Sequence, residues 1–213
     1  MYSVPVSGPT SPSRAERKEQ TRQALLGHTL DLSAERGFAN VSLREIARAT
    51  GIVPTAFYRH FASLDELGLA LVDDGIRTMR VALREARRVP GPANANDSLP
   101  VLFEQVRANR ALFRFLYRER YAGPPEMRRA IAAEFDLIER ELTVDLSRMH
   151  ALATWDTGDL ELAAGLIVAA VVPAIADFLA APTPAGEQDV IERVRRQLLL
   201  IMLGMGSWRP NRR

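Results

Sequence analysis

The chain has 213 residues, of which 47% are hydrophobic, and it carries 28 Lys and Arg against 26 Asp and Glu, a formal net charge of +2. This length and composition suffice for one large domain or two small ones with a buried core. Because the sequence contains no cysteine, it excludes disulfide scaffolds, thiolate zinc sites, iron–sulfur clusters and thiol nucleophiles.

The charge is unevenly distributed along the chain. Residues 1–63 hold eight Lys and Arg and five Asp and Glu, a balance of +3, whereas residues 64–213 hold 20 against 21, a balance of −1. A polyanionic partner is therefore expected to bind the first third of the chain.

The N-terminal segment, residues 1–13, contains three prolines and four serines, which predicts a disordered arm. It lacks a positive head followed by an apolar run, so we expect no signal peptide. The longest apolar stretch, Leu162–Ala176, contains Gly165 and Pro173 and is shorter than the roughly 20 residues that a spanning helix needs. We therefore expect a cytoplasmic protein without a membrane span.

The first predicted helix covers about Glu16 to Arg36. Its apolar residues recur near helical spacing at Leu25, Leu26, Leu30 and Leu32. Gly37 follows where a left-handed C-terminal cap is expected, so the helix should end there.

Two short helices are predicted next. Ser42 and Glu45 have capping-box spacing, in which each side chain satisfies a free backbone N–H, and Gly51 should end this helix. Pro54 occupies a first-turn position, where its missing N–H costs nothing, and opens a helix to about His60. Two helices in this order form a helix-turn-helix, whose second helix can enter the DNA major groove.

The second of these helices carries side chains suited to DNA. Phe57 and Phe61 are expected to anchor it inward, which leaves small, aromatic and basic residues outside, where they can contact base edges and phosphates. Free N–H groups at the preceding helix start attract anions as well. Tyr58 and His60 could alternatively be half-buried helix residues. The predicted DNA-binding residues are Arg14, Arg17, Lys18, Ser42, Arg44, Thr55, Ala56, Tyr58, Arg59 and His60.

The rest of the chain is helical by period. Ser63 and Glu66 repeat the capping signature and open a long helix to about Arg88, followed by a polar loop over Ala93–Ser98. Further helices are predicted at 99–108, 110–121, 125–151, 160–180 and 187–207. Without sustained strand alternation, we expect an all-α fold of about nine helices. Its predicted domains are a three-helix helix-turn-helix DNA-binding domain, 14–63, and a helical ligand-binding and dimerisation domain, 64–213.

Several motifs in the first third occur in a known order and spacing: Gly37-Phe38, Ser42–Ala47, Gly51-Ile52 and Phe57–Phe61, followed by Leu64 and Leu67. With them, the stretch from about Arg14 to Val72 resembles the N-terminal domain of TetR-family transcriptional regulators. The resemblance implies a homodimer on a near-palindromic operator, pairing of the last two helices across the two-fold axis, and a ligand pocket in the C-terminal domain.

Some positions depart from the family pattern. Gly27, His28 and Ser33 stand where larger or more helix-favouring apolar residues are usual. Val53 is a poor helix cap where Ser or Thr is common.

A narrower resemblance extends beyond the helix-turn-helix. Asp65–Leu69 and Leu116–Arg120 are similar to the subgroup that regulates unsaturated fatty-acid synthesis and acyl desaturation. This similarity implies a ligand-responsive repressor whose effector is a long-chain acyl-CoA, with no metal and no other cofactor.

An acyl-CoA needs an apolar tunnel and a basic mouth for its phosphates. The same residues are equally compatible with an ordinary helical core and with solvated or ion-paired arginines. The candidate wall residues are Phe103, Val106, Phe113, Leu116, Phe135, Ile138, Val168 and Val172, and the candidate mouth residues are Arg118 and Arg120.

The last two predicted helices suggest self-association. Leu160–Ala180 is apolar around most of its circumference, and the final helix adds a second apolar stripe, which together favour a four-helix dimer interface.

Two other functions stay open. The chain could be a TetR-type regulator of an efflux or catabolic operon that responds to a small drug or metabolite. Its helical C-terminal part could also be an enzyme or lipid-carrier module. Because the sequence has no nucleophile elbow and no phosphate-binding glycine loop, we expect that it is not an enzyme.

Overall fold

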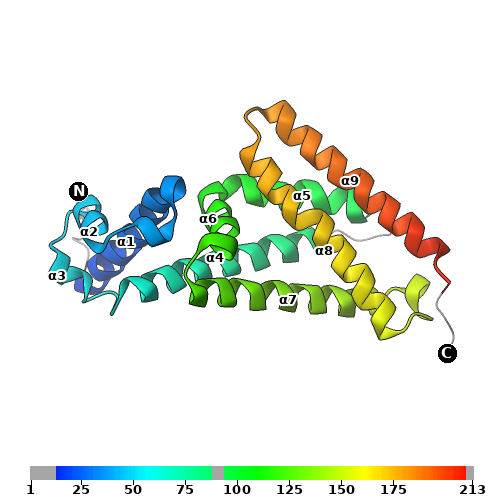
Figure 1. Cartoon of the computed structure of the whole chain (residues 1–213), viewed down its shortest axis with the longest axis horizontal. Helices are drawn as coiled ribbons and strands as arrows, with labels where there is room; N and C mark the ends of the chain where they lie inside the picture. Colours follow the sequence, from blue (N-terminus) through cyan, green and yellow to red (C-terminus); the bar gives the residue numbers. More distant parts are fainter. Residues whose placement is uncertain (1–12, 88–93, 210–213) are drawn as a thin grey trace, which may run out of the picture. The chain divides into compact units, whose positions relative to one another are not determined.

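The structure, a computed structural model, describes residues 13–87 and 94–209. These residues form nine α-helices, two short 3-10 helices and no strand (Figure 1), which confirms the predicted all-α fold. The predicted disordered arm lies outside the described residues except for Ser13. The helices are α1 (Arg14–Arg36), η1 (Phe38–Asn40), α2 (Leu43–Thr50), α3 (Pro54–Phe57), α4 (Leu64–Arg87), α5 (Asn94–Ala108), α6 (Arg110–Ala122), α7 (Pro125–Ser147), η2 (His150–Leu152), α8 (Thr157–Ala180) and α9 (Pro184–Ser207).

The chain divides into two compact units, and α4 runs from one into the other. Unit 1 comprises residues 1–70 and unit 2 comprises residues 71–213. In unit 1, α1 packs on α2 and α2 packs on α3. The core of unit 1 is built from apolar side chains that are almost fully buried: Leu25, Ile46, Ala47, Phe57 and Phe61.

Local capping defines the helices of unit 1. The Ser13 hydroxyl accepts from the Glu16 backbone N–H, and the Glu16 carboxylate accepts from the Ser13 N–H in return. This capping box starts α1 at Arg14, two residues before the predicted start. Gly51 ends α2 as expected, and with φ 74° and ψ 24° it adopts the left-handed conformation. Gly37 also has a positive φ of 81°, but its ψ of 156° lies outside the left-handed helical region, so that part of the prediction was wrong.

The predicted helix Pro54–His60 is too long, because α3 ends at Phe57. Beyond it, the Arg59 and His60 N–H groups donate to carbonyls three residues back, at Ala56 and Phe57. Tyr58, Arg59 and His60 therefore lie in turns that follow the helix.

In unit 2, several helix ends differ from the prediction. The polar loop expected up to Ser98 is wrong, because α5 already begins at Asn94. The helix expected to reach Ala151 ends at Ser147 and is followed by η2. Both α8 and α9 start three residues earlier than predicted, since Asp156 and Thr183 act as side-chain caps.

The last two helices lie side by side, and α7 packs against α8 (Figure 1). The core of unit 2 combines residues of α4 to α9 and includes Phe103 and Phe178, whose ring centroids are 4.9 Å apart. Within the described part of the chain, α8 is the one helix long and apolar enough to cross a membrane, with a mean hydropathy of 2.3 over its most apolar window. Length and composition alone do not distinguish such a span from a helix at a protein interface.

Candidate DNA-binding surface and effector cavity

The turn after α3 packs on buried aromatic rings. Phe57 and Phe61 are buried with ring centroids 5.8 Å apart, as the sequence predicted. Tyr58 packs edge-on against Phe57, with centroids 5.7 Å apart, yet it remains 61% exposed. The phenol is therefore fixed in direction while its hydroxyl faces solvent, a suitable arrangement for donating to a phosphate.

A cationic cluster surrounds His60. Burial lowers its pKa, and Lys18, Arg22 and Arg59 lower it further, while Glu19 acts in the opposite sense. Its Nδ1 atom is buried and has no hydrogen-bond partner among the described residues. The neutral imidazole thus sits among three cations, and an approaching phosphate would relieve their mutual repulsion.

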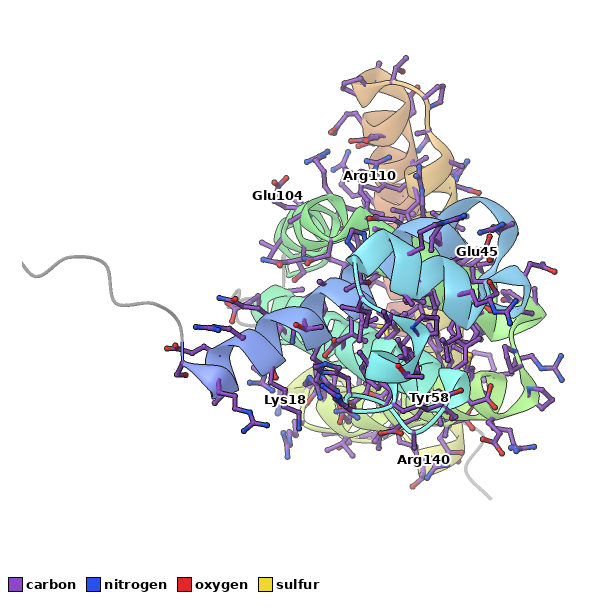
Figure 2. The ribbon with its side chains drawn as sticks, turned by 90° about the vertical axis from the view of Figure 1, so that its left-hand side faces the viewer. Lys18, Glu45, Tyr58, Glu104, Arg110 and Arg140 are labelled. Atoms are coloured by element: carbon purple, nitrogen blue, oxygen red, sulfur yellow. The ribbon has the colours of Figure 1, made fainter. Side chains whose placement is uncertain are left out.

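The cluster joins two elements of unit 1. The Arg22 guanidinium lies 4.9 Å from the centroid of the Phe61 ring, which brings α1 against the segment after α3. Figure 2 shows Lys18 of α1 and Tyr58 low in the view, with Glu45 of α2 above them. Sequence reasoning missed Arg22, although its spacing of four from Lys18 puts both on one face of α1.

The predicted DNA-binding residues differ in exposure. Ala56 and His60 are half-buried, whereas the others are exposed: Arg14, Arg17, Lys18, Ser42, Arg44, Thr55, Tyr58 and Arg59. The His60 cluster gathers Lys18 and Arg59. Arg14 and Arg44 are not among the charged residues that act on His60. A DNA contact by either residue stays a prediction.

The Glu45 carboxylate occupies the start of α2. The Ser42 hydroxyl accepts from the Glu45 N–H and donates to the Glu45 carboxylate, which also pairs with Arg36 at 2.8 Å. The hydrogen bonds from Ser42 lower the pKa of Glu45 to about 2, with a smaller contribution from Arg36. A phosphate contact by Ser42 would therefore have to displace or share this capping box.

Unit 2 contains an apolar cavity of about 180 Å³. Residues from α4 to α9 line it, including Met79, Leu99, Phe113, Phe135, Val168 and Leu198. Ser98 contributes the one polar side chain among its described lining residues, and no charged side chain lines it. Such walls suit a hydrocarbon-like ligand or part of a ligand.

The cavity gathers half of the predicted ligand-binding residues. Its lining includes Phe113, Phe135, Ile138, Val168 and Val172. Phe103, Val106 and Leu116 are buried but do not line it. Leu116 packs instead against α4 at Gly75. The contact is so close that a Cβ atom added to Gly75 would lie only 2.7 Å from the Leu116 Cγ atom.

Three arginines of α5 and α6 form contacts with neighbouring helices. Arg110 pairs with Glu187 at 2.5 Å, and Arg114 donates to the Leu179 carbonyl at the end of α8, at 2.6 Å. Hydrogen bonds from Arg110 and then Arg107 lower the pKa of Glu187. These arginines hold helices together and are already occupied.

Arg120 is placed differently. Its guanidinium carbon lies 4.1 Å from the centroid of Phe135 and 5.4 Å from that of Tyr121. Neither Arg118 nor Arg120 lines the cavity, but Phe135 does, so Arg120 lies against a wall ring.

The face of α8 and α9 exposes large apolar side chains. Leu162, Leu166, Leu200 and Leu203 are 58–70% exposed. A hollow of about 400 Å³ lies at this face and includes Leu162 and Leu166 in its wall. Another, of about 510 Å³, lies between η2 and the end of α9 and shares Trp155 and Trp208 with it. An apolar surface of this kind is typical of an interface with another protein chain.

Residues 25–71 match the family described as bacterial regulatory proteins, tetR family. The fold is similar to those of two transcriptional regulators from Rhodococcus sp. RHA1, one with 21% identity over 86% of this chain and 96% of that one, TM-score 0.68, and one, TetR-like, with 24% identity over 93% and 100%, TM-score 0.65. It is also similar to the TetR-family regulator PfmR from Thermus thermophilus, with 21% identity over 89% and 99% of the chains, TM-score 0.64. These descriptions name no effector.

Proposed function

We propose that this chain is a cytoplasmic transcriptional repressor of the tetR family, because residues 25–71 match that family and the fold is similar to those of solved transcriptional regulators. It binds a near-palindromic operator as a homodimer and changes its operator affinity when an effector occupies the cavity of unit 2. The observation that carries this proposal is the exposed surface of Tyr58 and Arg59 beside the His60 cluster.

Operator binding depends first on this surface. Replacing Tyr58 and Arg59 together by alanine should reduce affinity for a palindromic duplex by about a hundredfold or more, since two phosphate or base contacts are lost. The matched control is Tyr121→Ala with Arg129→Ala, a tyrosine of equal exposure and an exposed arginine on unit 2. Gel-shift titration measures both, with circular dichroism as the check of folding. Undiminished binding by the Tyr58/Arg59 variant would refute the assignment.

Homodimer formation would cover the exposed face of α8 and α9. Stable dimers bury apolar surface at their core, and the exposed leucines on this face supply it. Replacing Leu166 and Leu203 by glutamate should convert the dimer to a monomer in light scattering. A wild-type chain that is monomeric at micromolar concentration would contradict this part of the proposal.

For the effector we propose a long-chain acyl-CoA and, with it, control of fatty-acid desaturation. The apolar cavity supports this proposal because its walls fit an acyl chain. Arg110 and Arg114 do not support it, since both are engaged within the fold. Titrating saturated and unsaturated acyl-CoAs of increasing length into an operator shift assay tests it, and indifference to all of them would exclude it.

The alternative effector is a small drug or metabolite, as for a regulator of an efflux or catabolic operon. One observation favours a small metabolite over a long-chain acyl-CoA: the cavity of about 180 Å³ is smaller than the roughly 300 Å³ and more of usual ligand sites. Mass spectrometry of small molecules that copurify with the chain separates the two effectors.

A further inference from the structure

Arg120 differs from the other half-buried arginines of unit 2. Arg80 pairs with Glu134 and Glu141, and Arg110 pairs with Glu187. Arg120 has no ion pair and no side-chain hydrogen bond among the described residues, and its guanidinium rests on aromatic faces alone.

This arrangement leaves the donors of Arg120 available. The rings of Phe135 and Tyr121 offer no hydrogen-bond acceptor comparable to a carboxylate, so the five N–H donors of the guanidinium are not used by these contacts. A planar fork of this kind matches a carboxylate or phosphate in two parallel, charge-assisted hydrogen bonds. Aromatic stacking also holds the fork in one orientation, which lowers the entropy lost on binding.

Phe135 connects this fork to the cavity. Its ring lines the apolar cavity and also lies 4.1 Å from the guanidinium carbon of Arg120. Phe135 is therefore shared by an apolar cavity without charged walls and a cation that has no ion pair among the described residues.

We propose that unit 2 binds an amphipathic anion whose hydrocarbon part fills the cavity and whose carboxylate or phosphate is held by Arg120. The inference rests on the proposed effector cavity but not on DNA binding. It specifies the chemical class of the ligand: an apolar molecule with one anionic end, in place of a neutral or cationic one.

Calorimetric titration of the full chain with decanoate, 1-decanol and decanoyl-CoA tests this inference without DNA. We expect decanoate to bind about tenfold to hundredfold more tightly than 1-decanol, the usual contribution of a hydrogen bond to a charged group. Arg120→Met should remove this preference while leaving the affinity for 1-decanol unchanged, and Arg120→Lys should restore part of it. Arg128→Met, at an exposed arginine of α7, is the matched control and should behave as wild type.

The outcomes separate this inference from the proposed repressor function. Equal binding of decanoate and 1-decanol, or a preference that persists in Arg120→Met, overturns the inference even if the chain binds its operator. A preference that depends on Arg120 supports it even if no operator is found. Decanoyl-CoA distinguishes the two sources of the anion: tighter binding than decanoate assigns the CoA phosphates to Arg120, and weaker binding assigns a free carboxylate.

Discussion

The cations near His60 in unit 1 and the cations between the helices of unit 2 are used in opposite ways. In unit 1, Lys18, Arg22 and Arg59 lie around His60 and form no ion pairs among the described residues. In unit 2, Arg80 and Arg110 are matched to glutamates of neighbouring helices. Cations that are left unneutralised mark a surface prepared for an external anion, whereas paired cations hold helices in register.

The comparison extends to apolar residues. Unit 1 buries Phe38, Phe57 and Phe61 almost completely and exposes Tyr58, while unit 2 leaves a space in its core and an exposed apolar face on α8 and α9. Unit 1 therefore has a filled core and a polar surface. Unit 2 has a cavity that a ligand could fill and an apolar face that a partner chain could cover.

The largest expected effect comes from emptying the core of unit 1. Phe57→Ala removes a fully buried ring and should cost about 3–5 kcal/mol of unfolding free energy. Both tryptophans, Trp155 and Trp208, belong to unit 2. Circular dichroism should therefore show a lower denaturation midpoint for unit 1, while tryptophan fluorescence should show an unchanged midpoint for unit 2. A parallel loss in both signals would show that the units unfold together.

Filling the cavity should weaken ligand binding by unit 2 without affecting unit 1. Val168→Phe adds volume to the cavity wall, so it should reduce effector or decanoate affinity on the order of tenfold or more. Operator affinity without effector should not change, because Val168 belongs to unit 2. Val144→Phe, the same substitution at an exposed valine of α7, is the control for added volume in unit 2.

A smaller effect is expected at the start of α2. Ser42→Ala removes the cap of that helix and should lower stability by about 1 kcal/mol. Ser42→Asp, which keeps a capping acceptor, should lose less. If both variants match wild type in chemical denaturation, the capping box does not contribute to the stability of unit 1.

The start of α3 offers the opposite change. Val53 is its N-cap, makes no side-chain hydrogen bond and is 65% exposed. Val53→Ser should raise the stability of unit 1 by about 0.5–1 kcal/mol, because serine can accept a free N–H. The thermal midpoint measures this gain, and a lower midpoint would show that Val53 packs in a way its exposure does not reveal.

The smallest effect is a dependence on pH. The folded-state pKa of Glu45 is about 2, below its ordinary value of 4.5. The carboxylate therefore contributes stability above the unfolded pKa, and this contribution is lost as pH falls from about 4.5 toward 2. Wild type should be more stable than Glu45→Gln at pH 7, and the difference should shrink in acid denaturation experiments below pH 4.5.

The sequence alone determined what depends on neighbours within about four residues. The capping pair of Ser42 with Glu45, the stop at Gly51 and the inward spacing of Phe57 and Phe61 set helices and their buried sides. The end of α3 escaped prediction, because the helical pattern continues to His60 while the backbone changes to turns after Phe57.

Only the tertiary structure decided which groups meet across the chain. Arg110 pairs with Glu187, 77 residues away in the chain, which no local pattern indicates. Arg120 and Phe135 share one stacked contact, and the cavity takes its walls from six helices. Helical periodicity predicts that such side chains point inward, but the packing of whole helices decides whether they fill the core or leave a space.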